Sequence, residues 1–343
     1  MDDLKILITG CGAPGAYTII KKFREITERK IELIGIDMNP CATGKHFVDD
    51  FYTVPPANSD EYISTIEHLV EHLKPDILLP FTSPELIPLS KIFTYTKIMV
   101  NDTSTLITAD NKYKLYEALK GKIPLPEYRL IKGPKEFWFK KGELGYPDKK
   151  LCIKPVIGMG SRGFRIFDSN INKRDIFLNH KSDSAYMDIC QFTSIFTKDD
   201  HKYVFPPMLL SEFIEDTEYD CMVLANGKES LLTTVKTRDS ARCGFSFSGE
   251  LIESEEHMEL CNIIVKILSL KYCNGIQFIG NKLIEVNPRV STFVFGEGDS
   301  FNEVYLSIKM ALGELTEDEI REYKYKLPMK TKWIRIMDQY FYE

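Results

Sequence analysis

The sequence predicts a small doubly wound α/β domain followed by an α+β region. The first hundred residues alternate apolar, β-rich runs with segments of helical spacing, beginning with a strand at Leu4–Thr9 and a helix at 15–27. Such alternation implies right-handed crossovers and a parallel sheet. Beyond residue 104, short strands are separated by glycine and polar turns, which favours antiparallel pairs. The 343 residues, 43% of them hydrophobic, are enough for two or three packed lobes.

The elements of the first domain follow in order along the chain. After the first strand and helix we expect a strand at Ile31–Asp37, a helix at 59–72, a strand at 76–80, a helix at 84–94 and a strand at 97–101. In the second part we expect a helix at 111–119, several strand pairs, a helix and then an irregular loop within 170–203, a helix at 302–312 and an aromatic tail at 333–342.

Composition narrows the classes of partner. The formal net charge is -6 and the pI is about 5.7, so no basic field draws the chain to nucleic acid. The N-terminus lacks the basic start and apolar core of a secretory signal, and no apolar stretch has membrane-spanning length. The eight cysteines lack CxxC spacing, which is typical of reduced thiols. We therefore expect a cytoplasmic protein that acts on small molecules, without nucleic-acid or membrane partners. A homodimer is the common assembly for such chains.

A first glycine cluster, 10–15, follows a strand and opens a helix, and Asp37 ends the next strand. This arrangement satisfies the dinucleotide fingerprint, in which glycines admit a pyrophosphate and the acid binds a ribose hydroxyl. Any parallel α/β domain also needs a tight turn from strand to helix. We favour a structural or substrate-side role over nicotinamide binding.

A second cluster joins a lysine-ended strand to a glycine-rich loop. Lys154 is followed by a loop that carries Gly158, Gly160, Ser161 and Gly163. Glycines expose backbone N–H groups, and a lysine supplies a point charge, so the segment can fold over a polyphosphate. The alternative is a flexible hairpin with a surface lysine. The length of the loop favours the phosphate interpretation.

A third segment, 275–289, has two short strands joined by a Gly-Asn turn. Glu285 and Asn287 share a face because side chains alternate with period two, and their oxygens suit a hard cation such as Mg²⁺. A three-residue connection puts Gln277 on that face too, whereas a two-residue turn puts it on the other. Arg289 would then reach a terminal phosphate. The alternative is a solvated face of an edge hairpin, against which the surrounding apolar residues argue.

Two smaller features complete the set of candidates. The segment 209–220 is a strand, an acidic turn and another strand, whose acids could hold ribose hydroxyls or counter a lysine. An acidic surface turn is the alternative. Lys236 and Arg238 share a face of a β-rich region and could bind a phosphate or a substrate carboxylate, with a solvated basic face as the alternative.

The order of these motifs resembles the ATP-grasp superfamily. More narrowly, the strings Gly-Ile-Gln-Phe and Ile-Glu-Val-Asn-Pro-Arg are similar to a single synthetase domain of the carbamoyl-phosphate synthase large subunit, over about residues 4–312. The resemblance implies a Rossmann-like pre-ATP-grasp domain at 1–103 and a two-lobed ATP-grasp domain at 104–330. Its lid lobe would lie at roughly 120–210, and a C-terminal tail would follow at 331–343.

The resemblance also implies roles for single residues. Lys112 and Lys154 match lysines that contact ATP, and the loop with Gly158, Gly160, Ser161 and Gly163 matches a flap over the phosphates. Glu212, Phe213 and Ile214 match the hinge at the adenine edge, with Glu215 or Glu218 near the ribose. Gln277, Glu285 and Asn287 match metal ligands, and Arg289 matches the residue at the γ-phosphate. Lys236 and Arg238 remain further catalytic candidates on their own residue pattern, outside the resemblance.

The implied function is an ATP-dependent ligase that joins a carboxylate to an amine or a thiol through an acyl phosphate. Its cofactors would be ATP and Mg²⁺, with Mn²⁺ as an alternative ion. The chain has one synthetase unit rather than two and no glutaminase-type region, which argues against carbamoyl phosphate synthesis. Two competing hypotheses are an NAD(P)-dependent oxidoreductase that uses the N-terminal glycine loop, and a non-catalytic nucleotide-binding protein of the same fold.

Overall fold

The computed structural model describes residues 2–158, 160–180, 184–197, 204–242, 245–291, 296–297, 301–336 and 339–342. The backbone of Met159, within the predicted flap, and most of the stretch 291–299 therefore lie outside the described residues. The chain groups into two compact units. Unit 1 contains residues 1–109, 217–281 and 285–343, and unit 2 contains residues 110–216 and 282–284.

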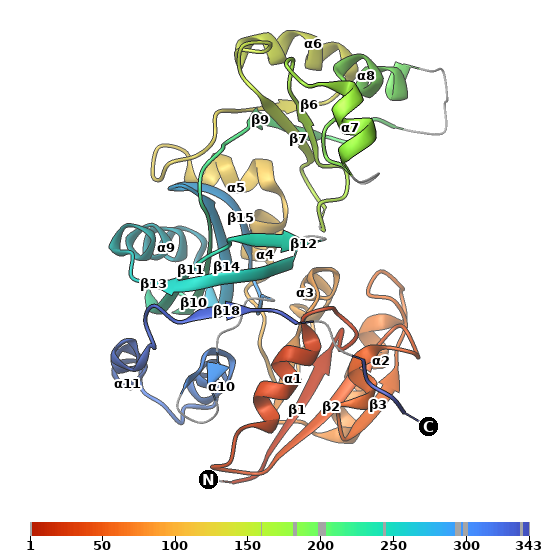
Figure 1. Ribbon diagram of the computed structural model, residues 1–343. Helices are drawn as coiled ribbons and strands as arrows, with labels where there is room; N and C mark the ends of the chain where they lie inside the picture. The colour runs from red at the N-terminus through yellow and green to blue at the C-terminus, as the bar shows by residue number, and fades with distance from the viewer. Residues whose placement is uncertain are drawn as a thin grey trace. The chain divides into compact units, whose positions relative to one another are not determined.

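Unit 1 begins with a parallel five-stranded sheet in the order β3-β2-β1-β4-β5 (Figure 1). Its elements are β1 (Leu4–Thr9), α1 (Ala16–Arg24), β2 (Ile31–Asp37), a 3-10 turn η1 (Thr43–His46), β3 (Asp50–Thr53), α2 (Tyr62–Leu73), β4 (Ile77–Pro80), α3 (Ser83–Leu89) and β5 (Lys97–Ile98). Alternate strand residues pack on α1 on one face and on α2 and α3 on the other. The predicted doubly wound α/β domain is confirmed.

A second sheet of unit 1 has the order β12-β13-β11-β10-β14-β15, and β18 pairs with β13. Its strands are β10 (Glu218–Asn226), β11 (Ser230–Thr237), β12 (Ser240–Arg242), β13 (Phe245–Ile252), β14 (Lys271–Ile279), β15 (Lys282–Asn287) and β18 (Lys332–Ile334). The helices of this part are α4 (Thr103–Asp110), α9 (Glu255–Leu268) and α10 (Glu303–Leu312), and the short strands β16 (Gly296–Glu297) and β17 (Phe301–Asn302) pair with each other.

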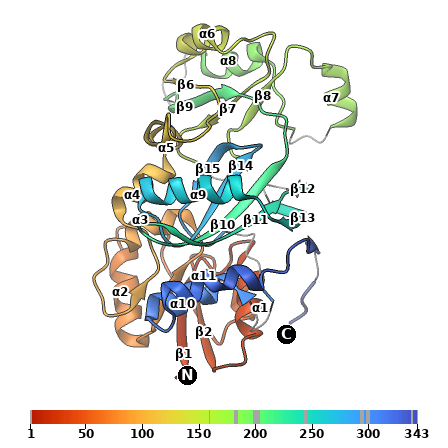
Figure 2. The same ribbon diagram turned by 90° about the vertical axis from the view of Figure 1, so that its left-hand side faces the viewer.

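Two helices cover opposite faces of this second sheet (Figures 1 and 2). On the first face, the ring of His257 on α9 lies 5.2 Å from that of Phe278 on β14. On the second face, apolar residues of β10 and β14 such as Met222 and Cys273 share a buried cluster with Val304 and Ile308 of α10. The second face carries the polar residues discussed below, because they alternate in register with Met222 and Cys273.

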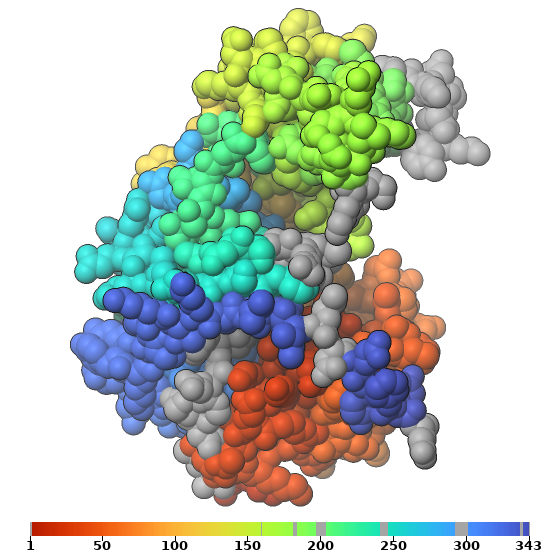
Figure 3. Space-filling view, viewed as in Figure 1, coloured from red at the N-terminus to blue at the C-terminus, as the bar shows by residue number. Residues whose placement is uncertain are grey.

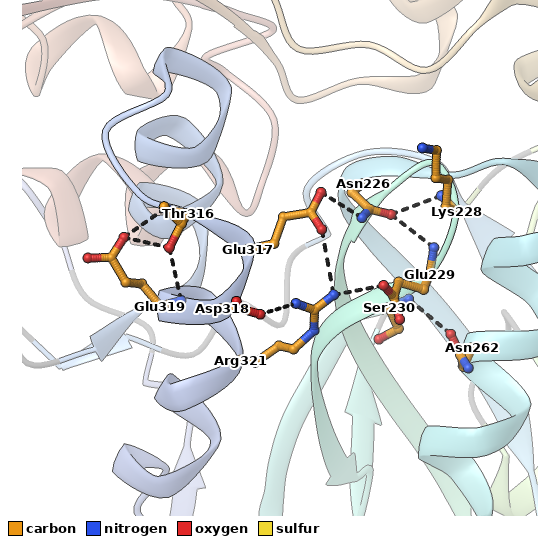
Figure 4. A network of polar contacts seen from close by, with 10 residues as sticks. All are labelled: Asn226, Lys228, Glu229, Ser230, Asn262, Thr316, Glu317, Asp318, Glu319 and Arg321. Atoms are coloured by element: carbon orange, nitrogen blue, oxygen red, sulfur yellow. Dashed lines mark hydrogen bonds and ion pairs between the residues drawn. The ribbon is translucent and has the colours of Figure 1, made fainter.

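A polar network attaches the last helix to the β10–β11 turn (Figure 4). Helix α11 (Glu317–Glu322) starts with a capping box between Thr316 and Glu319 and leads to the 3-10 turn η2 (Tyr323–Lys326). The guanidinium of Arg321 lies 2.7 Å from carboxylates of Asp318 and Glu229. These groups are largely exposed, so the network orients α11 more than it stabilises the fold.

The C-terminal residues attach to the N-terminal domain within the same unit. After β18, the Arg335 side chain donates to the carbonyl oxygen of Ser246 at 3.1 Å and to Thr18 Oγ1 of α1 at 3.4 Å. Further on, the ring of Tyr342 lies 3.9 Å from that of His46. In the space-filling view, these dark-blue atoms lie against the orange N-terminal domain (Figure 3). The predicted aromatic tail is therefore partly a strand that extends the second sheet.

Unit 2 is built on an antiparallel sheet in the order β6-β9-β7-β8. Its elements are α5 (Lys112–Leu119), β6 (Tyr128–Ile131), α6 (Pro134–Glu143), β7 (Leu151–Pro155), β8 (Arg165–Phe167), α7 (Lys173–Asn179), α8 (Ile189–Thr197) and β9 (Met208–Glu212). Where a single helix and an irregular loop were expected within 170–203, the described residues form two helices, and Phe192 of α8 is buried against Phe137 and Phe167. Residues 181–183 and 198–203 of this stretch lie outside the described residues. The predicted α+β character of the second part is confirmed.

Two findings concern the whole described chain. No described helix has both the length and the apolar character needed to cross a membrane. The seven described cysteines are all free, and five of them are buried, which fits the predicted reduced thiols. Cys41 and Cys190 are exposed and depart from the buried pattern.

Candidate active site

The N-terminal glycine cluster is packed against protein atoms. Gly10 has a φ of +62°, and a Cβ there would lie 2.4 Å from Thr82 Cγ2. The Gly12 N–H donates to Asp37 Oδ2 at 2.8 Å, and the Asn39 N–H donates to the other oxygen at 2.9 Å. The acid that a dinucleotide would need for its ribose therefore caps its own loop. The glycines allow close packing within the domain, and the nicotinamide hypothesis is not supported.

Arg289 follows β15 and contacts the start of α3 in unit 1. Its Nε donates to Ser83 Oγ at 3.0 Å, and its Nη1 donates to the carbonyl oxygen of Val290 at 2.9 Å. Burial lowers the pKa of Arg289, and the carboxylates of Glu285 and Glu85 oppose that shift. The guanidinium is thus held by Ser83 and the Val290 carbonyl oxygen, and the part of it that is not hydrogen-bonded can meet an anionic ligand.

Glu85 is a buried carboxyl in the first turn of α3. It accepts hydrogen bonds from Thr9 Oγ1 at 2.9 Å, from Tyr62 Oη at 3.3 Å and from Thr82 Oγ1. Burial raises the pKa of this carboxyl, while the three hydroxyls oppose the shift. The three donors fix α3 to β1 and α2, which in turn fixes Ser83 beneath Arg289.

Glu285 and Asn287 lie side by side on β15. The Asn287 amide donates to Glu285 Oε1 at 3.0 Å, so both side chains share one face of the strand. Both are partly buried, which excludes a fully solvated edge hairpin. The amide orients the carboxylate and leaves its second oxygen and the amide oxygen for a ligand.

Gln277 lies on the same face as Glu285 and Asn287, although the length of the connecting turn predicts the opposite face. The connection is the two-residue turn Gly280 and Asn281, which in a regular hairpin would put Gln277 on the opposite face. A Cβ on Gly275, however, would lie 3.7 Å from Asn287 Cβ. Gly275 and Gln277 are two residues apart, so Gln277 lies on the Asn287 face. Three oxygen-bearing side chains thus share one face, a donor set that suits Mg²⁺.

Lys236 and Asp220 continue the same row across the sheet. Gln277 on β14 lies opposite Asp220 on β10, and Asp220 lies opposite Lys236 on β11. Lys236 is 2% exposed, and its Nζ lies 3.7 Å from Glu303 Oε2 at the start of α10. Arg238 forms an ion pair with Glu218. These contacts exclude the alternative of a solvated basic face. Glu218, which was expected near the ribose, forms its ion pair with Arg238.

Glu303 is a residue of this face to which sequence reasoning gave no role, whereas Asp220 was considered only as one of the acids of 209–220. Asp220 is 1% exposed and accepts a hydrogen bond from Ser246 Oγ at 2.7 Å through Oδ2. Burial raises the pKa of its carboxyl from 3.8 to about 6, although Ser246, Arg238 and Lys236 oppose the shift. The acidic pattern of 209–220 was a signal for this residue, but its place in the row depends on strand register.

Asp220→Asn is expected to stabilise the protein in a pH-dependent way. The carboxyl has a higher pKa in the folded state than in the unfolded state, so its ionisation destabilises the fold. This destabilisation increases from pH 3.8 to about 6 and is complete above that range. The neutral amide avoids this cost, about 3 kcal/mol at pH 8. Thermal melts at pH 4 and pH 8 check this, with Asp239→Asn, at an exposed position between β11 and β12, as control. Equal effects of Asp220→Asn at both pH values would contradict the assigned burial.

In unit 2, both predicted phosphate lysines are anchored by backbone carbonyls. The Lys112 Nζ donates to the carbonyl oxygen of Gly158 at 2.8 Å. The Lys154 Nζ donates to the carbonyl oxygen of Ile284 at 3.2 Å and lies 5.8 Å from the centre of the Tyr116 ring. Ile284 directly precedes Glu285 in the chain, so Lys154 contacts the strand that carries the predicted metal ligands.

The glycine-rich loop that follows β7 has an unusual backbone. Gly160, Ser161 and Gly163 have φ values of +63°, +57° and +76°. Backbone N–H groups in a turn of this kind are able to line an anion-binding concavity. Gly163 also needs to be glycine for packing, because a Cβ there would lie 2.9 Å from Pro155 Cγ.

The predicted hinge is already hydrogen-bonded within unit 2. Glu212 pairs with Lys282 and accepts the Glu127 N–H at 2.9 Å. Burial tends to raise the pKa of Glu212, but these two partners lower it overall. The Phe213 N–H donates to the carbonyl oxygen of Lys150 at 3.0 Å. The structure therefore gives Glu212 and the Phe213 N–H structural roles, and Ile214 follows them in the loop toward β10.

Two known protein families match this chain, one in each part. Residues 109–293 match the family described as ATP-grasp domain, and residues 6–103 match the family described as PylC-like, N-terminal domain. The first match covers more than half of the chain. The chain belongs to the ATP-grasp family. The predicted family and its enzyme class, a ligase, are confirmed at this level, whereas a specific similarity to carbamoyl-phosphate synthase is not shown. No curated protein sequence matches this ATP-grasp chain.

Solved structures show the same fold at low sequence identity. One is N5-carboxyaminoimidazole synthetase from Staphylococcus aureus with ADP, which is 12% identical with a TM-score of 0.60 over 84% of this chain and 70% of that one. A second is the biotin carboxylase domain of Hydrogenobacter thermophilus 2-oxoglutarate carboxylase with MgADP and bicarbonate. It is 18% identical with a TM-score of 0.62 over 91% of this chain and 70% of that one. A third is biotin carboxylase from Campylobacter jejuni, which is 15% identical with a TM-score of 0.61 over 92% of this chain and 72% of that one.

Proposed function

We propose that this ATP-grasp chain is a Mg²⁺-dependent ligase that joins a carboxylate to an amine, or to a thiol, through an acyl phosphate. The observation that carries the proposal is the hydrogen-bonded pair Glu285 and Asn287, with Gln277 on the same face and Arg289 directly after the strand. Bound ADP or MgADP in the similar structures supports a nucleotide as ligand. The packed N-terminal glycine loop gives no comparable support to a nicotinamide cofactor.

The residues have separate tasks in this proposal. Gln277, Glu285 and Asn287 would hold Mg²⁺, which when bound would neutralise phosphate charge. Lys112 and Lys154 donate to phosphate oxygens, and the loop that follows β7 covers the phosphates and excludes water. Arg289 stabilises charge on the transferred phosphoryl group.

The bond changes follow from these tasks. An oxygen of the substrate carboxylate attacks the γ-phosphorus, the bond to the β–γ bridging oxygen breaks, and ADP leaves. The amine nitrogen then attacks the acyl carbon, inorganic phosphate leaves, and the amine loses a proton to solvent or a nearby base. The described residues thus act by positioning and charge stabilisation rather than as covalent nucleophiles.

A phosphate-release screen tests the proposed reaction. Pairs of small carboxylates and amines are incubated with the protein, ATP and Mg²⁺, and phosphate is measured against each substrate alone. We expect at least one pair to release phosphate in equal amount to a new amide, and EDTA to stop the release. Background release across a broad panel, despite tight Mg-ATP binding, would favour the non-catalytic nucleotide-binding hypothesis.

A further inference from the structure

Asn101 lies between β5, the last strand of the parallel sheet, and α4, and it is 2% exposed. Its Nδ2 donates to Asn274 Oδ1 at 2.9 Å and to the carbonyl oxygen of Pro288 at 3.1 Å. Its Oδ1 accepts the Lys271 N–H at 2.6 Å. Both amide hydrogens and the amide oxygen are thus engaged, and exchanging the nitrogen and the oxygen would break the bonds to both backbone groups.

Asn274 on β14 fixes the orientation of the Asn101 amide. It is 0% exposed, and its Nδ2 donates to the carbonyl oxygens of Lys271 and Tyr272, both at 3.0 Å. Because these two bonds use both hydrogens, the Oδ1 of Asn274 is the atom that faces Asn101. Every amide hydrogen of the pair has a partner, and a buried network satisfied in this way favours a single arrangement of the chain.

The hydrogen bond to Pro288 connects this pair to the proposed active site. Pro288 is buried and stands between Asn287, a proposed metal ligand, and Arg289. The turn is tight, because the Arg289 N–H donates to the carbonyl oxygen of Asn287 at 2.7 Å. Proline has no N–H, so its carbonyl oxygen is the backbone group through which a hydrogen bond can hold Pro288. Asn101 therefore fixes the backbone of the turn from which Arg289 projects.

The Asn101 pair faces away from the predicted metal site. Side chains alternate along β14, and Asn274 is three residues from Gln277, so these two side chains lie on opposite faces of the strand. Asn101 bonds to Asn274 and meets the site through the Pro288 backbone. Position decides the effect of a group that stabilises charge in a transition state, since a displacement of about 1 Å can cost about 100-fold in rate.

We propose that Asn101 is a positioning residue for Arg289. By holding the Pro288 carbonyl oxygen, it keeps the Arg289 guanidinium where it meets the transferred phosphoryl group. The inference rests on the proposed function, which supplies the role of Arg289. It assigns part of the geometry of the site to the N-terminal domain, to which Ser83, the partner of the Arg289 Nε, also belongs.

Thr105 provides a matched control for a purely structural role. It is 7% exposed, and its Oγ1 donates to the carbonyl oxygen of Leu268 at 2.7 Å, which joins α4 to the end of α9. Thr105→Val therefore removes a buried hydrogen bond to a backbone carbonyl without touching the turn after β15. We expect both Thr105→Val and Asn101→Ala to lose stability, whereas a change at the phosphoryl group is expected in Asn101→Ala alone.

Binding of MgADP with and without aluminium fluoride, an anionic mimic of the transferred phosphoryl group, tests this proposal without turnover. Calorimetric titrations compare wild type, Asn101→Ala and Thr105→Val, and thermal melts record the stability of each. We expect aluminium fluoride to lower the Kd of MgADP in wild type. Asn101→Ala should lose at least tenfold of this gain, and Thr105→Val should keep it. In an Arg289→Gln background, Asn101→Ala should cause no further loss. Asn101→Ser takes the place of Asn101→Ala if that variant does not fold.

Equal gains from aluminium fluoride in wild type and Asn101→Ala would overturn the proposal. So would equal losses in Asn101→Ala and Thr105→Val, or a further loss in the Arg289→Gln background, because each would show a role that does not act through Arg289. A wild type that binds MgADP without any gain from aluminium fluoride would overturn it together with the role of Arg289. The affinity for MgADP alone reports on the proposed function separately, and its absence in wild type would reject the function and the inference together.

Discussion

Glu285→Gln is expected to lower kcat for Mg²⁺-dependent ATP turnover about 1,000-fold, a loss on the scale of removing a preorganised charge-stabilising group. The substitution removes the charge that holds the metal but keeps an oxygen that can accept from Asn287. The fold should therefore survive. Steady-state phosphate release gives kcat, and a thermal melt reports on folding.

Glu250→Gln provides the matched control for this experiment. Glu250 lies on β13 of the same sheet, outside the proposed site, and its Oε2 lies 4.0 Å from Lys332 Nζ. It should retain wild-type turnover. If Glu285→Gln turned over ATP at nearly the normal rate, the assignment of the metal ligands would be wrong.

Lys154→Met is expected to reduce kcat/KM for ATP about 100-fold, which corresponds to the loss of one charge-assisted hydrogen bond. The methionine keeps the apolar stem over Tyr116, and the Tyr116 hydroxyl still donates to the Ile284 carbonyl oxygen at 3.2 Å. Local structure should therefore persist while the phosphate contact is lost. Initial rates over a range of ATP concentrations give the ratio.

Lys120→Met is the control, because the Lys120 side chain is 68% exposed and lies 4.0 Å from Glu117. It should leave kcat/KM unchanged. An unchanged kcat/KM in Lys154→Met would show that Lys154 supports β15 through Ile284 and does not touch the nucleotide.

The elements that could be predicted from the sequence are those whose burial shows as a regular local pattern of apolar residues. The strands Leu4–Thr9 and Ile31–Asp37 were predicted with their observed bounds, because strands buried on both faces are continuous apolar runs. Helix α8 was missed, since its buried Phe192 lies in a polar, weakly periodic segment and packs on rings distant in sequence. Local pattern cannot show such a contact.

In the candidate site, too, residues on one strand could be predicted from the sequence, whereas residues brought together from different strands could not. Glu285 and Asn287 could be placed on one face because they are two residues apart on one strand. The row formed by Gln277, Asp220 and Lys236 depends on the register of three strands, which the sequence does not reveal. Even the turn length misleads for Gln277, since the two-residue turn predicts the opposite face.

Calorimetric titration with ATP tests the central claim most directly. We expect saturable one-to-one binding in the presence of Mg²⁺, much weaker binding after EDTA treatment, and no heat from NAD under the same conditions. The loss of affinity on removing the ion should be absent in Glu285→Gln, because that variant has already lost its metal ligand. Failure of ATP to bind with Mg²⁺ present, or binding that is indifferent to the ion in the wild type, would contradict the account.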